Sequence, residues 1–179
     1  MNRRYFLSSS VALGTVALFA KLPLGAGLFG VDKTKKGNSA YSLNAQGVKK
    51  VTKTNEEWKR ILSADQYNVT REKGTESPFS SPLNEIHERG IFECVACDLP
   101  LFSSVAKFDS GTGWPSFWQP IAQENVHQEV DKSLAETRTE VSCARCDSHI
   151  GHVFADGPRP TGLRYCMNGV ALKFVKDKA

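Results

Sequence analysis

Two cysteine pairs constrain this chain more than any other feature of its sequence. Cys94-Val-Ala-Cys97 and Cys143-Ala-Arg-Cys146 are both C-x-x-C motifs, and 45 residues lie between them. Each motif can direct two sulfurs to one side, and two such turns supply the four thiolates of a tetrahedral zinc site. A metal bound in this way ties distant segments together and contributes directly to folding. The pattern therefore predicts a small domain with a structural zinc site formed by all four cysteines.

The residues alone leave other uses of these motifs open. C-x-x-C is also a redox dithiol, although in thioredoxin-type proteins it belongs to an α/β fold. Disulfides would be stable in an oxidising compartment, and iron could occupy the same four sulfurs. Covalent haem attachment is excluded, because Asp98 and Asp147, not histidines, follow the two pairs. Among these alternatives we favour structural zinc.

The first 27 residues have the pattern of an export signal. Arg3 and Arg4 precede Phe6 and a run of apolar and small residues at 11–20, as in twin-arginine signals, which export folded proteins. The run is shorter than the ~20 residues of a spanning helix, so we favour a periplasmic protein. An inner-membrane anchor, if the leader is not cleaved, is the alternative, and we expect membrane contact only through the leader. Folded export would let zinc bind reduced thiols before an oxidising compartment is reached.

The rest of the chain divides into a linker and one domain. Residues 28–50 are polar, with scattered Gly and Lys, and are predicted to be a linker before a domain at 51–179. The leader holds three basic residues and no acidic one, so the net charge of +4 falls to +1 without it. Charges of both signs are mixed along the domain, which excludes the clustered Lys and Arg of a nucleic-acid-binding surface.

Two short helices are predicted at the start of the domain. Thr54 with Glu57, and Ser63 with Gln66, match capping boxes. Trp58 lies on an apolar helical stripe and is expected in the core.

Short strands are predicted from residue 78 onward, where apolar stretches alternate with Gly, Pro, Ser and Asp. Five stretches have this character: GIFECV (90–95), VHQEVD (126–131), TRTEVSC (137–143), GHVFAD (151–156) and RYCMNGVALKFV (164–175). No long helical pattern separates them, so crossover helices and a parallel sheet are not expected. The fold class is therefore mainly β and mostly antiparallel, with the helices first.

Cys166, the fifth cysteine, is left without a partner. A lone thiol in an exported protein is either buried as a small hydrophobe or reactive. On a strand, Arg164, Cys166 and Asn168 would project from one face, where a cation and an amide donor favour the thiolate and are rare in a core. Gly169 then suggests a bulge. These neighbours favour a reactive thiol.

His149, His152 and Trp114 are the candidate partners of this thiol. The histidines follow the second cysteine pair at a spacing that would suit zinc ligands, but four cysteines already fill a tetrahedral shell. Trp114 lies between Gly113 and Pro115, and by itself such a residue is more often in a core. The combination of a thiol, two imidazoles, an arginine and an indole indicates an active site.

The stretches CDLPLF, FDSGTGWPSFW and TEVSCARCDSHIGHVFADGPRPTGLRYCMNGVALKF closely resemble methionine sulfoxide reductase type B. The likeness runs from about residue 54 to 174. It implies two antiparallel sheets forming an open barrel-like core, N-terminal helices and a bound zinc. The implied activity is thiol-dependent reduction of methionine R-sulfoxide in proteins back to methionine, and hence repair of oxidised proteins.

The resemblance also implies a role for each matching residue. The nucleophile is Cys166, with His152 as proton donor and His149, Asn168 and Arg164 around them. Trp114 and Phe154 form the substrate pocket. The zinc ligands are Cys94, Cys97, Cys143 and Cys146.

Thr112 departs from the pattern of many members of this family. They carry a resolving cysteine in the loop before the tryptophan, where this chain reads SGTGW. A sulfenic acid on Cys166 must then be reduced by an external thiol, either a thioredoxin-like protein or a small thiol. Two other functions stay in view: a binding module without catalysis, and a dithiol oxidoreductase that uses a C-x-x-C pair.

Overall fold

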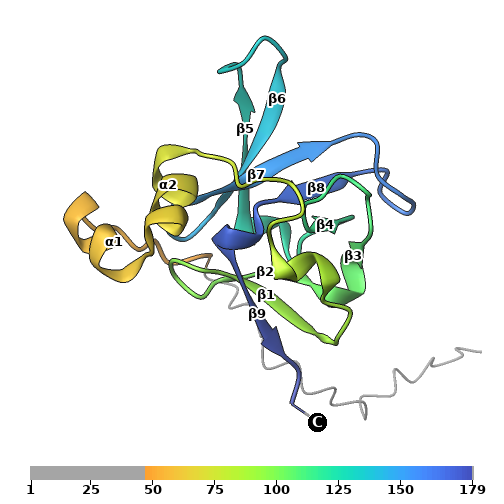
Figure 1. Ribbon diagram of the computed structural model, residues 1–179, viewed down its shortest axis with the longest axis horizontal. Coiled ribbons are helices and arrows are strands. Elements are labelled where there is room, and N and C mark those ends of the chain that lie inside the picture. Colours follow the sequence, from red (N-terminus) through yellow and green to blue (C-terminus); the bar gives the residue numbers. More distant parts are fainter. Residues whose placement is uncertain (1–46, 179) are drawn as a thin grey trace, which may run out of the picture. The chain divides into compact units, whose positions relative to one another are not determined.

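The computed structural model describes residues 47–178 (Figure 1). The leader predicted at 1–27 and most of the linker predicted at 28–50 lie outside the described residues. Within the described part, no helix combines the length and the apolar character needed to cross a membrane.

Two short helices open the domain, α1 (Asn55–Ile61) and α2 (Ala64–Glu72). Both predicted capping boxes are present, because each N-cap side chain accepts from the third helical N–H and the Glu or Gln there accepts from the N-cap N–H. The core position expected for Trp58 is confirmed, since only 2% of this residue is exposed. The end of α2 is defined by Lys73, which takes the left-handed conformation with φ 58°.

Antiparallel strands in two sheets form the body of the described chain, which confirms the predicted fold class. In the three-stranded sheet the order is β2-β1-β9, and in the six-stranded sheet it is β3-β4-β8-β7-β6-β5. The strands are β1 (Gly90–Cys94), β2 (Pro100–Ser103), β3 (Lys107–Phe108), β4 (Ser116–Phe117), β5 (Val126–Asp131), β6 (Arg138–Cys143), β7 (His149–Phe154), β8 (Arg164–Met167) and β9 (Leu172–Lys176). One 3-10 turn, η1 (Pro82–Glu85), precedes β1. Three more lie between strands: η2 (Ser104–Ala106), η3 (Gln123–Asn125) and η4 (Gly169–Ala171).

Aromatic side chains join the two sheets into one core. Phe92 and Phe102 come from the three-stranded sheet, and Phe117 and Tyr165 come from the six-stranded one; all four are at most 1% exposed. The ring centroids of Phe102 and Phe117 are 4.5 Å apart and stacked, and those of Phe92 and Phe117 are 4.9 Å apart and edge-on. Such pairs add to the burial of apolar area that holds sheets together.

The stretch predicted as one strand at 164–175 is in fact two strands in different sheets. β8 ends at Met167, the turn η4 follows, and β9 then crosses to the three-stranded sheet. Gly169 therefore begins a 3-10 turn, and the predicted bulge is wrong. The turn packs closely on Ser81, whose Oγ would lie 1.9 Å from a Cβ placed on Gly169. This contact comes from a segment almost 90 residues away, so the alternation of apolar residues around Gly169 could not predict it.

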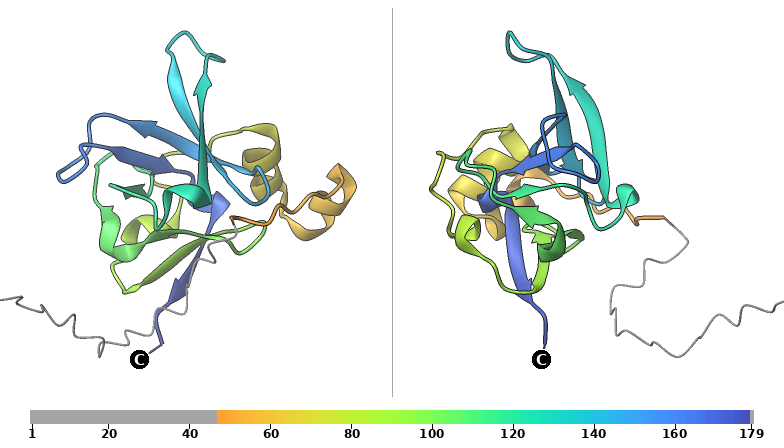
Figure 2. Two further views of the ribbon diagram at one scale, coloured as in Figure 1. Left: turned by 180° about the vertical axis from the view of Figure 1, so that it is seen from behind. Right: turned by 90° about the vertical axis from the view of Figure 1, so that its right-hand side faces the viewer.

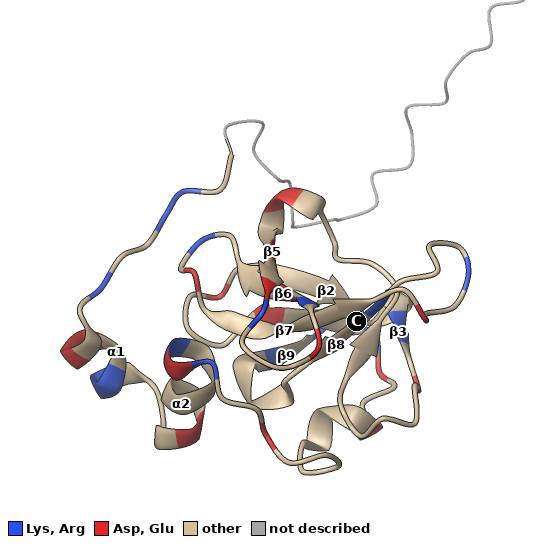
Figure 3. Ribbon diagram, turned by 90° about the horizontal axis from the view of Figure 1, so that it is seen from above, with Lys and Arg blue, Asp and Glu red and all other residues tan. Residues whose placement is uncertain are grey.

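The hairpin of β5 and β6 extends beyond the other strands, as Figures 1 and 2 show from three directions. Most side chains of β5 and of the turn after it are exposed, including Val130 and Leu134, each with 61% of its surface accessible, whereas those of β6 are half-buried or buried. β5 is the edge of the six-stranded sheet. Charged residues of both signs are interspersed over the helices and connecting segments (Figure 3).

Candidate active site and metal centre

The four paired cysteines lie together at the junction of the two sheets. Cys94 is the last residue of β1, and Cys143 is the last residue of β6. The sulfurs of Cys94 and Cys146 are 3.6 Å apart, those of Cys97 and Cys143 are 3.5 Å apart, and all four lie within 4.8 Å of one another. None is in a disulfide. Four sulfurs bound tetrahedrally at ~2.3 Å would be separated by about 3.8 Å, so the cluster fits a metal ion.

The two cysteine pairs reach this geometry through matching turns. After each pair, the N–H of the following aspartate donates to the carbonyl of the first cysteine, at 2.9 Å for both Asp98 and Asp147. Both aspartates have φ 57°, a left-handed conformation that aspartate tolerates better than most residues. These turns could have been predicted from the aspartate that follows each pair, which extends the motif to C-x-x-C-D.

Basic side chains surround the cluster. Arg71 donates to the carbonyl of Cys146 at 2.8 Å, and Arg145 donates to that of Cys97 at 3.1 Å. The pKa of Cys94 is raised well above its usual range, chiefly by hydrogen bonding with Cys143 and the other two thiols of the cluster. Four thiolates this close together would repel one another without a cation between them. A divalent ion held by all four would leave a net charge of −2, which the nearby guanidinium groups would offset.

A second site lies on the outer face of the six-stranded sheet. In β8, Tyr165 and Met167 point into the core, so Arg164 and Cys166 project from the opposite face. Cys166 is directly opposite His152 on β7. The sheet register therefore places the lone thiol beside an imidazole.

A pocket of about 130 Å³ opens at this thiol. Residues of β6, β7 and β8 form its floor, and the loops that cover this face add Thr75, Trp114 and Asn168. The lining residues are Thr75, Trp114, Arg138, Gly151, His152, Phe154, Cys166 and Asn168. The structure thus brings five of the predicted site residues around one cavity.

Burial controls the state of Cys166. It raises the pKa of this thiol, and hydrogen bonding by Thr112 and the charge of Arg164 lower it by less. The Oγ of Thr112 lies 3.9 Å from the sulfur. The neighbours that were expected to favour the thiolate are therefore outweighed, and the resting residue is a thiol at neutral pH.

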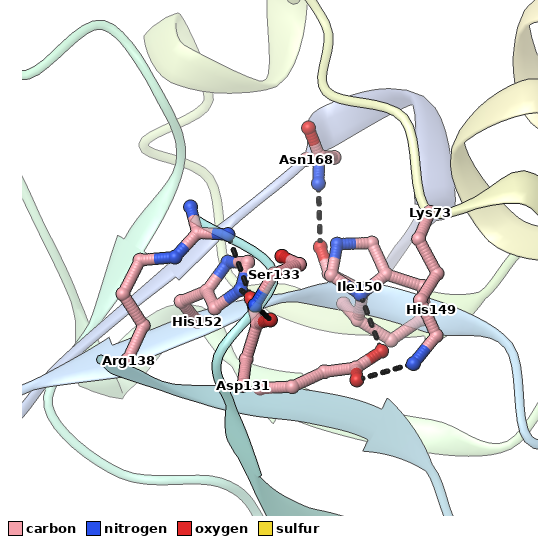
Figure 4. Close-up of polar contacts among 9 residues, drawn as sticks. Lys73, Asp131, Ser133, Arg138, His149, Ile150, His152 and Asn168 are labelled. Atoms are coloured by element: carbon pink, nitrogen blue, oxygen red, sulfur yellow. Dashed lines mark hydrogen bonds and ion pairs between the residues drawn. The ribbon is translucent and has the colours of Figure 1, made fainter. Parts of the chain in front are cut away.

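His152 is held by a carboxylate from the protruding hairpin (Figure 4). Its Nε2 lies 2.8 Å from Oδ2 of Asp131, which also accepts from Arg138 at 2.7 Å. The backbone N–H of Ser133 donates to the other oxygen at 2.8 Å. Hydrogen bonds from Ser133, and then from His152 and Arg138, hold the pKa of Asp131 well below its usual range.

His149 lies behind His152 and does not line the pocket. The two ring centroids are 5.3 Å apart, and His149 is 3% exposed. Its Nδ1 is 2.8 Å from Glu140, whose other oxygen accepts from Lys73 at 2.6 Å. Burial lowers the pKa of His149 in spite of this carboxylate, so the ring is neutral at neutral pH.

Asn168 lines the pocket, but it follows β8 and is not part of it. Its amide nitrogen donates to the carbonyl of Ile150 at 3.1 Å, and its oxygen accepts from the N–H of Glu76 at 3.0 Å. Both ends of the amide are therefore bound to backbone, whereas the sequence placed them beside the thiol. Glu76 also accepts the indole N–H of Trp114 at its carbonyl, 3.2 Å away.

Arg164 lies next to the pocket, outside its lining. Its guanidinium is 4.4 Å from the ring centroid of Phe154 and makes two hydrogen bonds to Asp156, at 2.9 and 2.8 Å. It therefore fixes the aromatic wall and acts on Cys166 through its charge.

Sequence reasoning missed four residues that organise the site: Glu76, Asp131, Arg138 and Glu140. A signal existed for two of them, because Arg138 and Glu140 alternate on a predicted strand and so share a face. None existed for Glu76, which lies about 90 residues before the segment that it contacts.

The fold and the site together define a class of protein: a two-sheet β domain with a four-cysteine metal site and one pocket thiol facing an imidazole and an indole. Comparisons with known proteins name the family. A model of the SelR domain matches residues 62–176. The peptide methionine sulfoxide reductase MsrB of Pseudomonas syringae pv. syringae is 56% identical over 126 residues, which cover 70% of this chain and 96% of that protein. The chain therefore belongs to the SelR domain family of methionine sulfoxide reductases B.

Other relatives agree with this assignment. The MsrB of Methanosarcina mazei is 53% identical over 129 residues, which cover 72% of this chain and 92% of that protein. Among solved structures, the Mis18 'Yippee-like' domain matches 51% of this chain and 100% of its own, with a TM-score of 0.40 and 17% identity. That likeness is too low to support an argument.

Proposed function

We propose that Cys166 is the nucleophile with which this reductase repairs methionine sulfoxide. The activity of the chain is that of a peptide-methionine (R)-S-oxide reductase of the MsrB type. One observation carries the assignment of the nucleophile: a single half-buried thiol opens into a pocket lined by His152 and Trp114. The other four cysteines are together in the metal cluster.

The reaction transfers oxygen from one sulfur to another. The Cys166 thiol gives up its proton as its sulfur attacks the sulfoxide sulfur. The oxygen then passes to Cys166, so that the substrate S–O bond and the transient S–S bond both break and a protonated sulfenic acid remains. The substrate leaves as a thioether. The sulfoxide sulfur is reduced by two electrons and Cys166 is oxidised by two, so thiol plus sulfoxide gives sulfenic acid plus methionine without any other reactant.

His152 supplies the proton that this step requires. Oxygen leaves sulfur only when it is protonated or strongly hydrogen-bonded, and an imidazole beside the nucleophile is suited to that task. His152 lies opposite Cys166 and lines the pocket. We assign His149 and Asn168 to holding this arrangement in place, because both are buried and bound by other groups.

Trp114 and Phe154 form the apolar part of the pocket. The indole offers a flat wall to the terminal methyl of the substrate and an aromatic face to a sulfur that gains positive charge. With methyl and oxygen held in separate places, only one configuration at sulfur presents its back to Cys166, and this accounts for selection of the R epimer.

The test is the substitution Cys166→Ser. It should abolish reduction of a peptide R-sulfoxide with dithiothreitol and leave the metal content and melting temperature unchanged. A matched control is Cys94→Ser, which should instead lose metal. Turnover retained in Cys166→Ser would overturn the proposed mechanism.

We further propose that the metal is zinc. Four thiolates in a tetrahedral cluster suit Zn²⁺, which would act here by stabilising the fold and not by chemistry at the pocket. Metal analysis should give one zinc per chain in a colourless protein. A strong visible absorption with stoichiometric iron would assign the site to iron instead.

The reductant of the Cys166 sulfenic acid is proposed to be an external thiol, either a thioredoxin-like protein or a small thiol. Thr112 stands where a resolving cysteine would be, with its Oγ 3.9 Å from the Cys166 sulfur. In Thr112→Cys, one turnover without reductant should form a disulfide between the new thiol and Cys166, visible as a loss of both free thiols. In the parent protein, stoichiometric sulfenic acid should accumulate and react with dimedone; formation of a disulfide there would contradict the proposal.

Export through the leader is also proposed, with the periplasm as destination. Its support is the sequence around Arg3 and Arg4, followed by the apolar run at 11–20. Replacement of both arginines by lysine should keep the protein in the cytoplasm, as measured by cell fractionation. N-terminal sequencing of the exported form would show whether the leader is removed, and unchanged distribution in the double variant would argue against this route.

A further inference from the structure

We propose that Asp131 is a positioning residue that fixes the ring of His152 with a proton on Nε2, so that Nδ1 is the nitrogen that exchanges a proton with the substrate oxygen. The inference rests on the proposed role of His152 as proton donor. It adds a residue from the protruding hairpin of β5 and β6, outside the motifs that carry the family likeness.

The contacts of Asp131 require a carboxylate at this point. Its Oδ2 accepts from Arg138 at 2.7 Å, and its Oδ1 accepts from the backbone N–H of Ser133 at 2.8 Å. Both partners are donors only in these contacts, so they hold the unprotonated form. An anionic Oδ2 at 2.8 Å from Nε2 of His152 can only accept a hydrogen bond, which places the proton on Nε2.

The arrangement also fixes the direction of the ring. Only 12% of the His152 side chain and 14% of the Asp131 side chain are exposed, so this hydrogen bond is largely shielded from water. Arg138 connects this contact to the pocket, because it donates to Asp131 and also lines the cavity. A carboxylate behind one ring nitrogen stabilises the imidazolium that donates from the other, as in other acid–base sites where a carboxylate orients a histidine.

The other charged groups near His152 do not replace Asp131 in this role. Glu140 lies opposite His152 on β6, but its two oxygens are bound to His149 and Lys73. His149 is buried behind the ring and faces Glu140. Among the described residues, Asp131 is therefore the carboxylate that contacts the proposed proton donor.

The substitution Asp131→Asn tests this role, with Glu129→Gln as the matched control. Glu129 is an exposed carboxylate two residues earlier on the same strand. In Asp131→Asn, kcat for a peptide R-sulfoxide should fall on the order of 10²-fold, the scale of a lost acid–base contribution, while KM changes less than about twofold, as expected when ground-state binding is kept. Glu129→Gln should keep the parent kcat.

Long-range ¹H–¹⁵N NMR of the histidine rings measures which ring nitrogen of His152 carries the proton. This tautomer would not change if Asp131 only stabilised the fold. The chain has four histidines, and His152→Gln assigns the signal. The parent protein should show His152 protonated on Nε2, and Asp131→Asn should populate the Nδ1–H form. A parent ring protonated on Nδ1, an unchanged tautomer in Asp131→Asn, or a kcat equal to that of Glu129→Gln would each overturn the inference.

The activities of the same variants distinguish a failure of this inference from a failure of the proposed function. If His152→Gln itself keeps the parent kcat, the acid role of His152 is wrong, and so is the mechanism proposed above. If His152→Gln is inactive and Asp131→Asn is fully active, only the positioning role of Asp131 fails.

Discussion

At Cys166, burial and hydrogen bonding act in opposite directions on one thiol. Burial raises its pKa, and Thr112 and Arg164 lower it by less. The thiol form therefore dominates at neutral pH, and the population of thiolate grows as pH rises toward and through the raised pKa. Reactivity of this enzyme toward alkylating agents should consequently increase with pH over a range above that of an ordinary thiol.

Thr112→Val should move that range further upward, because the substitution removes a hydrogen bond to the thiolate. The measurement is the rate of iodoacetamide reaction at Cys166 as a function of pH, read by mass spectrometry of the peptide that contains it. Thr137→Val, at an exposed position on the hairpin connection, serves as control. Equal midpoints in the two variants would show that Thr112 does not act on the thiol.

Single residues also show how much of the active site can be predicted from the sequence alone. The four metal-binding cysteines follow from their spacing, and the thiol was singled out as the cysteine without a partner. The surroundings of His149 and Asn168 did not follow, because their partners Glu140 and Glu76 are fixed by sheet register and by a loop. Local sequence specifies which groups are reactive, and long-range contacts decide what each group touches.

At the scale of elements, the loop between α2 and η1 connects the substrate wall to the end of β8. The carboxylate of Glu76 accepts the N–H groups of Gly169 at 2.6 Å and Val170 at 2.8 Å. Its backbone binds Asn168 and the indole of Trp114. One residue of this loop thus sets the position of two pocket residues.

Glu76→Gln should weaken this connection, because a neutral amide oxygen is a poorer acceptor and its NH₂ group cannot accept. The expected loss of stability is about 1–3 kcal/mol, measured by urea unfolding, together with a raised KM as the indole wall loosens. Glu72→Gln, on the exposed end of α2, is the control. A variant at Glu76 with unchanged stability and KM would contradict this account.

Helices and strands marked by a capping box or by alternating apolar residues were predicted well, and elements without such a pattern were not. Capping boxes defined both helices, and alternation located β5 and β6 to within a residue. β3 and β4 are two residues long each and exist only through pairing, so no pattern marks them. The break after β8 depends on close packing of Gly169 on Ser81, which sequence periodicity does not express.

At the scale of the whole domain, the metal cluster joins two sheets that otherwise meet through an aromatic core. One cysteine pair begins at the last residue of β1 and the other at the last residue of β6, so an ion bound by all four would link both sheets at one point. The two antiparallel sheets were expected from the family resemblance, but their strand order was not, because it depends on pairings between distant segments.

Removal of the metal should therefore unfold the domain or lower its melting temperature strongly. Apparent binding free energies of structural zinc are roughly 10–16 kcal/mol in small peptides, comparable to the 5–15 kcal/mol that stabilise a typical domain. Melting curves with and without a strong chelator, followed by circular dichroism, measure the effect. Cys143→Ser should behave as the stripped protein and Cys166→Ser as the parent; a stripped protein that melts at the parent temperature would refute the link.

The size of the cavity at Cys166, about 130 Å³, limits which methionine sulfoxides of a target protein can be reduced. A volume of this size suits the side chain of one oxidised methionine, which has to project from the target protein to reach Cys166. An oxidised methionine in the interior of a target must therefore be released by local unfolding before it can enter, whereas one on a surface loop is accessible at once. The order in which damaged sites recover in a client protein should follow their accessibility in that client more closely than the sequence around them.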